Sequence, residues 1–110
     1  MNSPLSESER TSAMEPPAGA IDIGGGHVIA YAHYEDEIAG ITDWHRKADG
    51  NWCCGWVPFK DTPWSRAFAG NPNYQSWDVV QREPLTLSPS LLCRACKDHG
   101  FIRNGKWVKA

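Results

Sequence analysis

Three residues of the metal-ligating types lie close together near the C-terminal end of the chain. Cys93, Cys96 and His99 form a Cys-x-x-Cys-x-x-His motif, placed between the apolar pair 91–92 and a predicted hairpin. Two cysteines separated by two residues can turn a tight loop so that both thiolates approach one ion, and the imidazole three residues later can reach the same point. A structural zinc site is tetrahedral and needs four donors. The motif therefore predicts a Zn²⁺ site to which it contributes three ligands.

The fourth ligand is expected from the other pair of cysteines, Cys53-Cys54, which lies on a predicted strand. Successive strand side chains point to opposite faces, so only one of the two is expected to reach the ion. The alternation does not decide between them, and His45, across a predicted hairpin turn, is a further candidate. Four protein ligands leave no open coordination position, so such a site organises the fold and does not activate water.

Three alternatives to zinc explain the cysteines less well. A disulfide framework requires an oxidising compartment, and the polar N-terminal segment does not have the pattern of a secretory signal. A redox Cys-x-x-Cys pair normally opens a helix in a βαβ unit, whereas this pair precedes a predicted hairpin. Four unrelated thiols are the third alternative.

The elements that must position these ligands have the sequence patterns of strands. The β pattern begins at Ile21, and the glycine run 24–26 punctuates a turn before a β-branched and aromatic segment. Further strands are expected at 27–31, 38–46, 51–59, 77–81 and 85–87. The Asp-Gly pair in 47–50 favours a hairpin, and 60–76 is expected to be a surface loop.

The last predicted hairpin has the clearest turn. Asn104-Gly105 tolerates the positive φ angles of a type I′ turn, and it places Ile102 opposite Trp107 and Phe101 opposite Val108. No segment shows a sustained 3.6-residue apolar period. The prediction is a mostly β fold, a small antiparallel β-hairpin domain stapled by one structural zinc.

The 110 residues divide into two predicted parts. Residues 1–19 are rich in Ser, Glu and Pro and are expected to form a flexible N-terminal arm, and residues 20–110 a zinc-binding β domain. A domain of that size buries only about 60–65% of its unfolded surface, so a metal cross-link would support its core. No apolar run approaches the roughly 20 residues of a membrane span, and no membrane association is expected.

Charge is distributed unevenly along a chain whose net charge is −2. The first 43 residues are acidic, whereas the C-terminal segment carries Arg94, Lys97, Arg103, Lys106 and Lys109. A weakly acidic total argues against a protein that coats nucleic acid by charge alone. The simpler interpretation of these cations is a solvated face and a charged tail. The alternative is a basic surface that meets an acidic partner or the acidic first half of the chain. Ser88 and Ser90 flank Pro89 and are expected to serve a turn, so no catalytic residue is predicted.

The C-terminal motif resembles that of a family of small uncharacterised bacterial and tailed-phage proteins, classed as a domain of unknown function. The resemblance rests on Leu-Thr-Leu-Ser-Pro-Ser-Leu-Leu-Cys at 85–93, Cys96, His-Gly-Phe-Ile-Arg at 99–103, Gly105 and Trp-Val at 107–108. It covers residues 77–110 and, less closely, 52–59. The resemblance implies a compact zinc-binding β domain, and some relatives are encoded near bacterial ubiquitin-like conjugation systems. It also favours Cys53 over Cys54, which gives the ligand set Cys53, Cys93, Cys96 and His99.

Together these observations predict a non-enzymatic, zinc-stabilised domain that acts by binding a protein. Its expected setting is phage-encoded, as a virion component or a host-directed accessory factor, in the bacterial cytoplasm or on the virion. The alternative is a zinc-ribbon-like nucleic-acid-binding module that uses the basic C-terminal segment. A metal hydrolase is the least favoured hypothesis.

Overall fold

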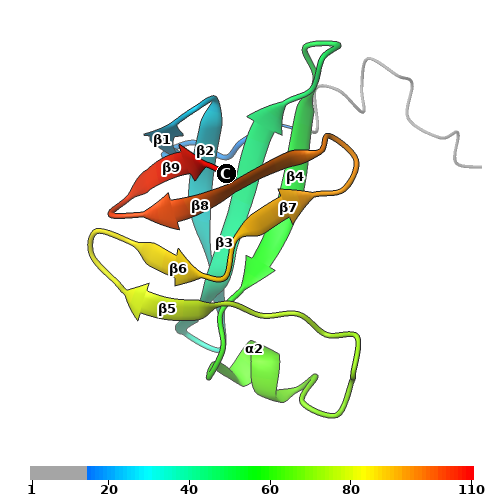
Figure 1. The fold of residues 1–110 in the computed structure, drawn as a ribbon. Coiled ribbons are helices and arrows are strands. Elements are labelled where there is room, and N and C mark those ends of the chain that lie inside the picture. The colour runs from blue at the N-terminus through cyan, green and yellow to red at the C-terminus, as the bar shows by residue number, and fades with distance from the viewer. Residues whose placement is uncertain (1–14) are drawn as a thin grey trace, which may run out of the picture.

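The first half of the chain forms one antiparallel sheet. In the computed structural model, which describes residues 15–110, its strands are β1 (Ile21–Gly24), β2 (His27–Tyr34), β3 (Glu37–Arg46) and β4 (Trp52–Pro58), in the order β1-β2-β3-β4 (Figure 1). Gly25 and Gly26 turn β1 into β2 with φ angles of 64° and 83°, a region that favours glycine. The predicted Asp-Gly turn closes the β3–β4 hairpin, where the Lys47 N–H donates to the Asn51 carbonyl at 2.7 Å.

The second half forms two smaller antiparallel sheets. Strands β5 (Asp78–Gln81) and β6 (Thr86–Ser88) pair with each other, and β7 (Leu91–Cys93), β8 (Asp98–Arg103) and β9 (Lys106–Lys109) form a three-stranded sheet in that order. The predicted pairs Ile102–Trp107 and Phe101–Val108 are confirmed. Asn104 and Gly105 have φ angles of 51° and 72°, as a type I′ turn requires.

The segment 60–76, expected to be loop throughout, contains a short helix, α2 (Pro63–Arg66). Thr62 caps it, because its side-chain oxygen accepts the Ser65 backbone N–H at 3.2 Å, and Pro63 supplies a φ angle suited to the first turn. One helical turn is too short to give an apolar period, so the sequence pattern could not reveal it.

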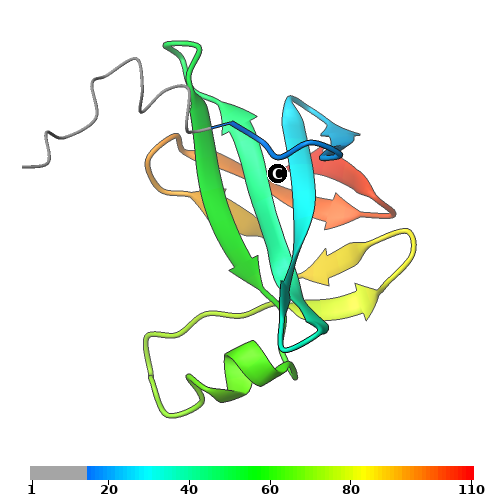
Figure 2. The same ribbon diagram turned by 180° about the vertical axis from the view of Figure 1, so that it is seen from behind.

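The hydrophobic core lies between the four-stranded sheet and the C-terminal strands, which cross one of its faces (Figures 1 and 2). Strand alternation turns Ala39, Ile41, Asp43 and His45 of β3 to this inner face, and all four are buried. The inner face of one strand thus changes from apolar to polar side chains. The polar end is the part that builds the candidate site.

The structure bears on part of the predicted N-terminal arm. Residues 1–14 of the predicted arm 1–19 lie outside the described residues, and in the remainder the Ala20 N–H donates to the Pro17 carbonyl at 3.1 Å. Within residues 15–110, no helix is long and apolar enough to cross a membrane.

Candidate metal centre

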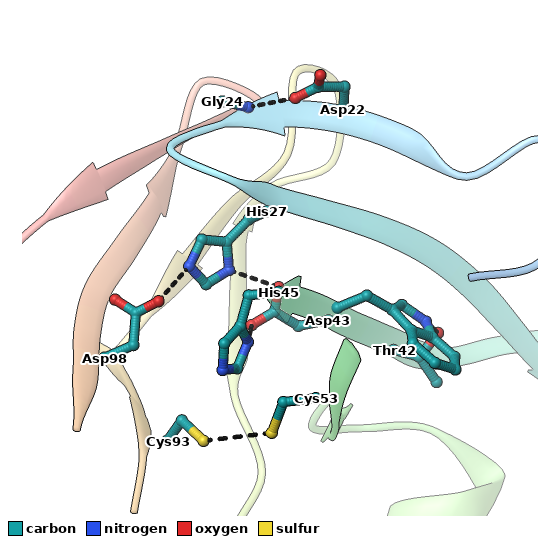
Figure 3. A network of polar contacts seen from close by, with 10 residues as sticks. Asp22, Gly24, His27, Thr42, Asp43, His45, Cys53, Cys93 and Asp98 are labelled. Carbon is teal, nitrogen blue, oxygen red and sulfur yellow. Dashed lines mark hydrogen bonds and ion pairs between the residues drawn. The ribbon is translucent and has the colours of Figure 1, made fainter. Parts of the chain in front are cut away.

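Three cysteines and one histidine meet at the polar end of the interface between the sheets. The ligand atoms of His45, Cys53, Cys93 and Cys96 all lie within 4.8 Å of one another. Cys53 and Cys93 are 40 residues apart in the sequence, yet their sulfur atoms lie 3.7 Å from each other (Figure 3). These side chains are within the distance needed to hold one metal ion.

The distance between the sulfurs fits a metal site and not a disulfide. A disulfide has an S–S length of about 2.05 Å, and all four cysteines of the chain are free. Two sulfurs bound tetrahedrally at about 2.3 Å from one zinc are about 3.8 Å apart. The observed 3.7 Å between Cys53 Sγ and Cys93 Sγ matches the edge of that tetrahedron.

The structure does not bring His99 to the three cysteines as expected: the histidine that lies beside them is His45, and His99 lies outside the cluster. The motif does not form one continuous loop: Cys93 ends β7, and β8 has already begun at Asp98, which pairs with Cys93. Alternation along β8 turns Asp98 inward and His99 outward. There the His99 Nε2 lies 2.8 Å from the Ser90 hydroxyl oxygen, and both groups are exposed.

The register of the β3–β4 hairpin explains how His45 reaches the sulfurs. His45 pairs directly with Cys53 across the two strands, so both side chains point to the same inner face. Cys54 pairs with Trp44 and points to the opposite face, which agrees with the choice of Cys53 over Cys54. Burial and the charge of Asp43 raise the pKa of the Cys54 thiol, so Cys54 stays a protonated thiol at neutral pH.

The turn between β7 and β8 presents the other two cysteines. The Lys97 N–H donates to the Cys93 carbonyl at 2.7 Å, and Lys97 adopts a φ of 61°. Burial favours the neutral Cys93 thiol. The Cys96 backbone N–H, the hydrogen bonds with the thiols of Cys53 and Cys96, and the Ala95 backbone N–H together outweigh burial and lower the pKa of Cys93. The turn and the neighbouring thiols thus favour the thiolate, which is the form that binds a metal.

Cys53 shows the opposite shift. Burial, followed by the hydrogen bonds with Cys93 and Cys96, raises the pKa of Cys53 to about 12. Several sulfurs packed this closely cannot all be anions unless a cation lies among them. The cluster thus has the chemistry of a site that exchanges protons for a metal ion.

His45 provides an independent indication of a ligand. Its side chain is only 6% exposed, yet within the described part of the chain neither Nδ1 nor Nε2 has a hydrogen-bond partner. A buried polar atom without a partner costs about 1–3 kcal/mol. A metal at the sulfurs satisfies one of these nitrogens, so the donor set and the unpaired histidine point to the same occupant.

A second polar group lies beside the cluster. Both ring nitrogens of buried His27 face carboxylates, with Nδ1 2.8 Å from Asp43 and Nε2 2.7 Å from Asp98 (Figure 3). Ionised carboxylates accept and do not donate, so this arrangement favours a proton on both nitrogens. Burial lowers the pKa of His27, but the bonds and charges of Asp43 and Asp98 outweigh it, and the pKa lies above its ordinary value.

The basic C-terminal residues do not gather on one surface. Lys97 and Lys109 line an open groove beside the metal centre, together with Arg46 of β3. Arg103 and Lys106 pair with each other at the opposite end of the β8–β9 hairpin. No continuous basic stripe is formed by these residues.

Comparison of the chain with protein-family models, with curated proteins and with solved structures found no match. The geometry of the site therefore carries the functional argument.

Proposed function

We propose that this protein is a zinc-stabilised β domain whose metal has a structural and not a catalytic role. The observation that carries the proposal is the convergence of His45, Cys53, Cys93 and Cys96 within 4.8 Å. Three thiolates and one imidazole are donors that suit Zn²⁺. With four protein ligands the ion has no position for water or substrate, which argues against a metal hydrolase.

The position of the site supports a structural role. The metal would join the β3–β4 hairpin to the β7–β8 turn, two segments on opposite sides of the core. A cross-link of this kind stabilises only the folded state, because the unfolded chain has no preformed site. If zinc is present at 1,000 times its dissociation constant, it adds about 4 kcal/mol to the free energy of unfolding.

Metal analysis and thermal unfolding of matched cysteine variants test this proposal. We expect one zinc per chain and, with a strong chelator, a melting temperature lowered by about 20 °C, from about 4 kcal/mol at about 5 °C per kcal/mol. Cys53→Ser is expected to lose the zinc, whereas its neighbour Cys54→Ser is expected to retain it. Equal zinc content in the two variants, or unchanged melting in chelator, would contradict the proposal.

We further propose that the domain acts by binding a protein, and that the outer face of the β7–β9 sheet takes part. Register places Leu92, Phe101 and Val108 on this face, and Leu92 and Val108 are 55% and 37% exposed. Arg103 and Lys106 lie at its end, and neither has an acidic partner within 4 Å among residues 15–110. An apolar surface with cations at its rim suits a partner protein that carries acidic side chains around an apolar centre.

The resemblance noted in the sequence leads us to propose a bacterial or phage setting for that partner, as a virion component or a host protein in the cytoplasm. The double variant Leu92→Lys/Val108→Lys is expected to lose a partner that co-purifies with the wild-type chain while its zinc content is unchanged. Retention of the partner would refute this face. Binding to a short DNA duplex that weakens steeply with salt would instead favour the nucleic-acid alternative.

A further inference from the structure

A chain of buried polar contacts leads away from the metal centre and gives Asp43 a specific role. We propose that Asp43 is a positioning residue of the metal centre: its Oδ2 accepts a hydrogen bond from the Nδ1–H of His45, so that Nε2 faces the metal. This inference rests on the proposed function, because it requires a metal among the sulfurs.

The orientation of the His45 ring supports this role. Nδ1 lies 4.0 Å from Asp43 Oδ2, and the other ring nitrogen points toward the sulfurs of Cys53 and Cys93 (Figure 3). Closure by about 1 Å brings the pair to hydrogen-bond distance. A histidine that binds a metal almost always donates its second ring N–H to a carboxylate, a carbonyl or water. Within the described residues, Asp43 is the carboxylate that lies within 4.0 Å of His45.

Asp43 is itself held in place, which makes it an effective orienting group. Its other oxygen, Oδ1, accepts from His27 Nδ1 at 2.8 Å. His27 is fixed in turn by Asp98 at 2.7 Å and by stacking on Trp107, with ring centroids 3.7 Å apart. The carboxylate of Asp43 therefore cannot rotate freely, and its free oxygen stays directed at His45.

A second metal ion is the competing explanation of these residues. His27, His45 and Asp98 also lie within 4.8 Å of one another. However, both His27 nitrogens already bond carboxylates, and a second ion would have to displace one of these bonds. The geometry favours a hydrogen-bonded support for one metal.

Zinc affinities of Asp43→Asn and Asp98→Asn, measured by competition with a chromophoric chelator, test the proposal. Each variant removes one carboxylate from His27. In Asp43→Asn a single amide oxygen remains for the N–H groups of His27 and His45; the closer His27 occupies it, and the NH2 group then faces His45. We expect the affinity of Asp43→Asn to fall about 10- to 100-fold. Asp98→Asn loosens His27 but leaves both Asp43 oxygens in place, so its affinity is expected to fall clearly less. Equal losses, or no loss in Asp43→Asn, would overturn the role.

Long-range ¹H–¹⁵N spectra of the zinc-loaded wild-type chain provide a measurement that needs no variant. The proposal expects the proton of His45 on Nδ1 and the metal on Nε2. The reverse assignment, with the metal on Nδ1, overturns it even if Asp43→Asn does not fold. A wild-type chain that binds no zinc would refute the proposed function itself, which separates the two failures.

Discussion

Replacing His45 or His99 by glutamine separates two metal-ligand assignments that the sequence allowed. The structure places His45 at the sulfurs and His99 on the outer face of β8. Structural zinc sites contribute about 10–16 kcal/mol, which divided over four ligands is about 3 kcal/mol for each. His45→Gln is therefore expected to weaken zinc binding by roughly 100-fold. Glutamine keeps much of the side-chain volume, so packing around the site changes little.

The matched variant His99→Gln alters an exposed side chain whose partner is the exposed Ser90 hydroxyl. Its effect on the free energy of unfolding is expected to stay within about 0.5 kcal/mol, and its zinc affinity is expected to equal that of the wild type. Competition with a chromophoric chelator measures both affinities, and cobalt substitution reports the number of sulfur ligands. If His99→Gln loses zinc while His45→Gln keeps it, the assignment of the centre is refuted.

Three further predictions follow from the packing and the thiol chemistry. Ile41 is fully buried, and Ile41→Ala is expected to lower the free energy of unfolding, measured in urea, by about 3 kcal/mol. Val80 is 66% exposed, and Val80→Ala should change this free energy by less than about 0.5 kcal/mol. Similar losses in the two variants would contradict the core described above. Gly40→Ala should lower the free energy of unfolding by at least about 1–3 kcal/mol, because the new Cβ would collide with the β4 backbone. The control Gly55→Ala places its Cβ where no atom lies within 4 Å. Equal melting temperatures of the two variants would argue against the β3–β4 register. Burial and the neighbouring sulfurs raise the pKa of Cys53 to about 12, so without metal this thiol is protonated at neutral pH. Zinc affinity should therefore rise about tenfold per pH unit for each proton that binding releases. A zinc affinity that does not change between pH 6 and 7.5 would contradict this.

The fold was largely predictable because its hairpins carry their own turn signals. The Asp-Gly and Asn-Gly pairs mark turns that the structure contains, and the Asn104-Gly105 turn also fixed the register of its two strands. Turn chemistry is local and can be read from adjacent residues. The α2 helix escaped prediction because a single turn has no periodicity to detect.

The sequence predicted the three cysteines of the candidate metal centre, whereas it offered His45 only as a further candidate beside His99. Spacing within Cys-x-x-Cys-x-x-His suggested a local loop, whereas His45 pairs with Cys53 across the hairpin. A two-residue Asp49-Gly50 turn would place His45 opposite Cys54. The hairpin loop has three residues, 48–50, because the Lys47 N–H bonds the Asn51 carbonyl, and this extra residue places Cys53 opposite His45. Cross-strand register, not sequence proximity, selected the ligand.

The His27 network could not be derived from the chain alone. His27 and Asp98 are 71 residues apart and meet only because the β7–β9 sheet crosses the first sheet. Neither hydrophobic periodicity nor turn chemistry specifies how two sheets are stacked. Contacts of this kind depend on the packing of the assembled core.

Strand β3 places Ile41 in the core and Asp43 and His45 at the metal centre through a single alternation of side chains. Losing one residue between Ile41 and Asp43 would turn the polar pair outward while leaving the apolar residue in place. The same change would carry His45 away from Cys53. Strand β3 can therefore accept substitutions but not a change in its length, and insertions and deletions must fall in the connecting turns.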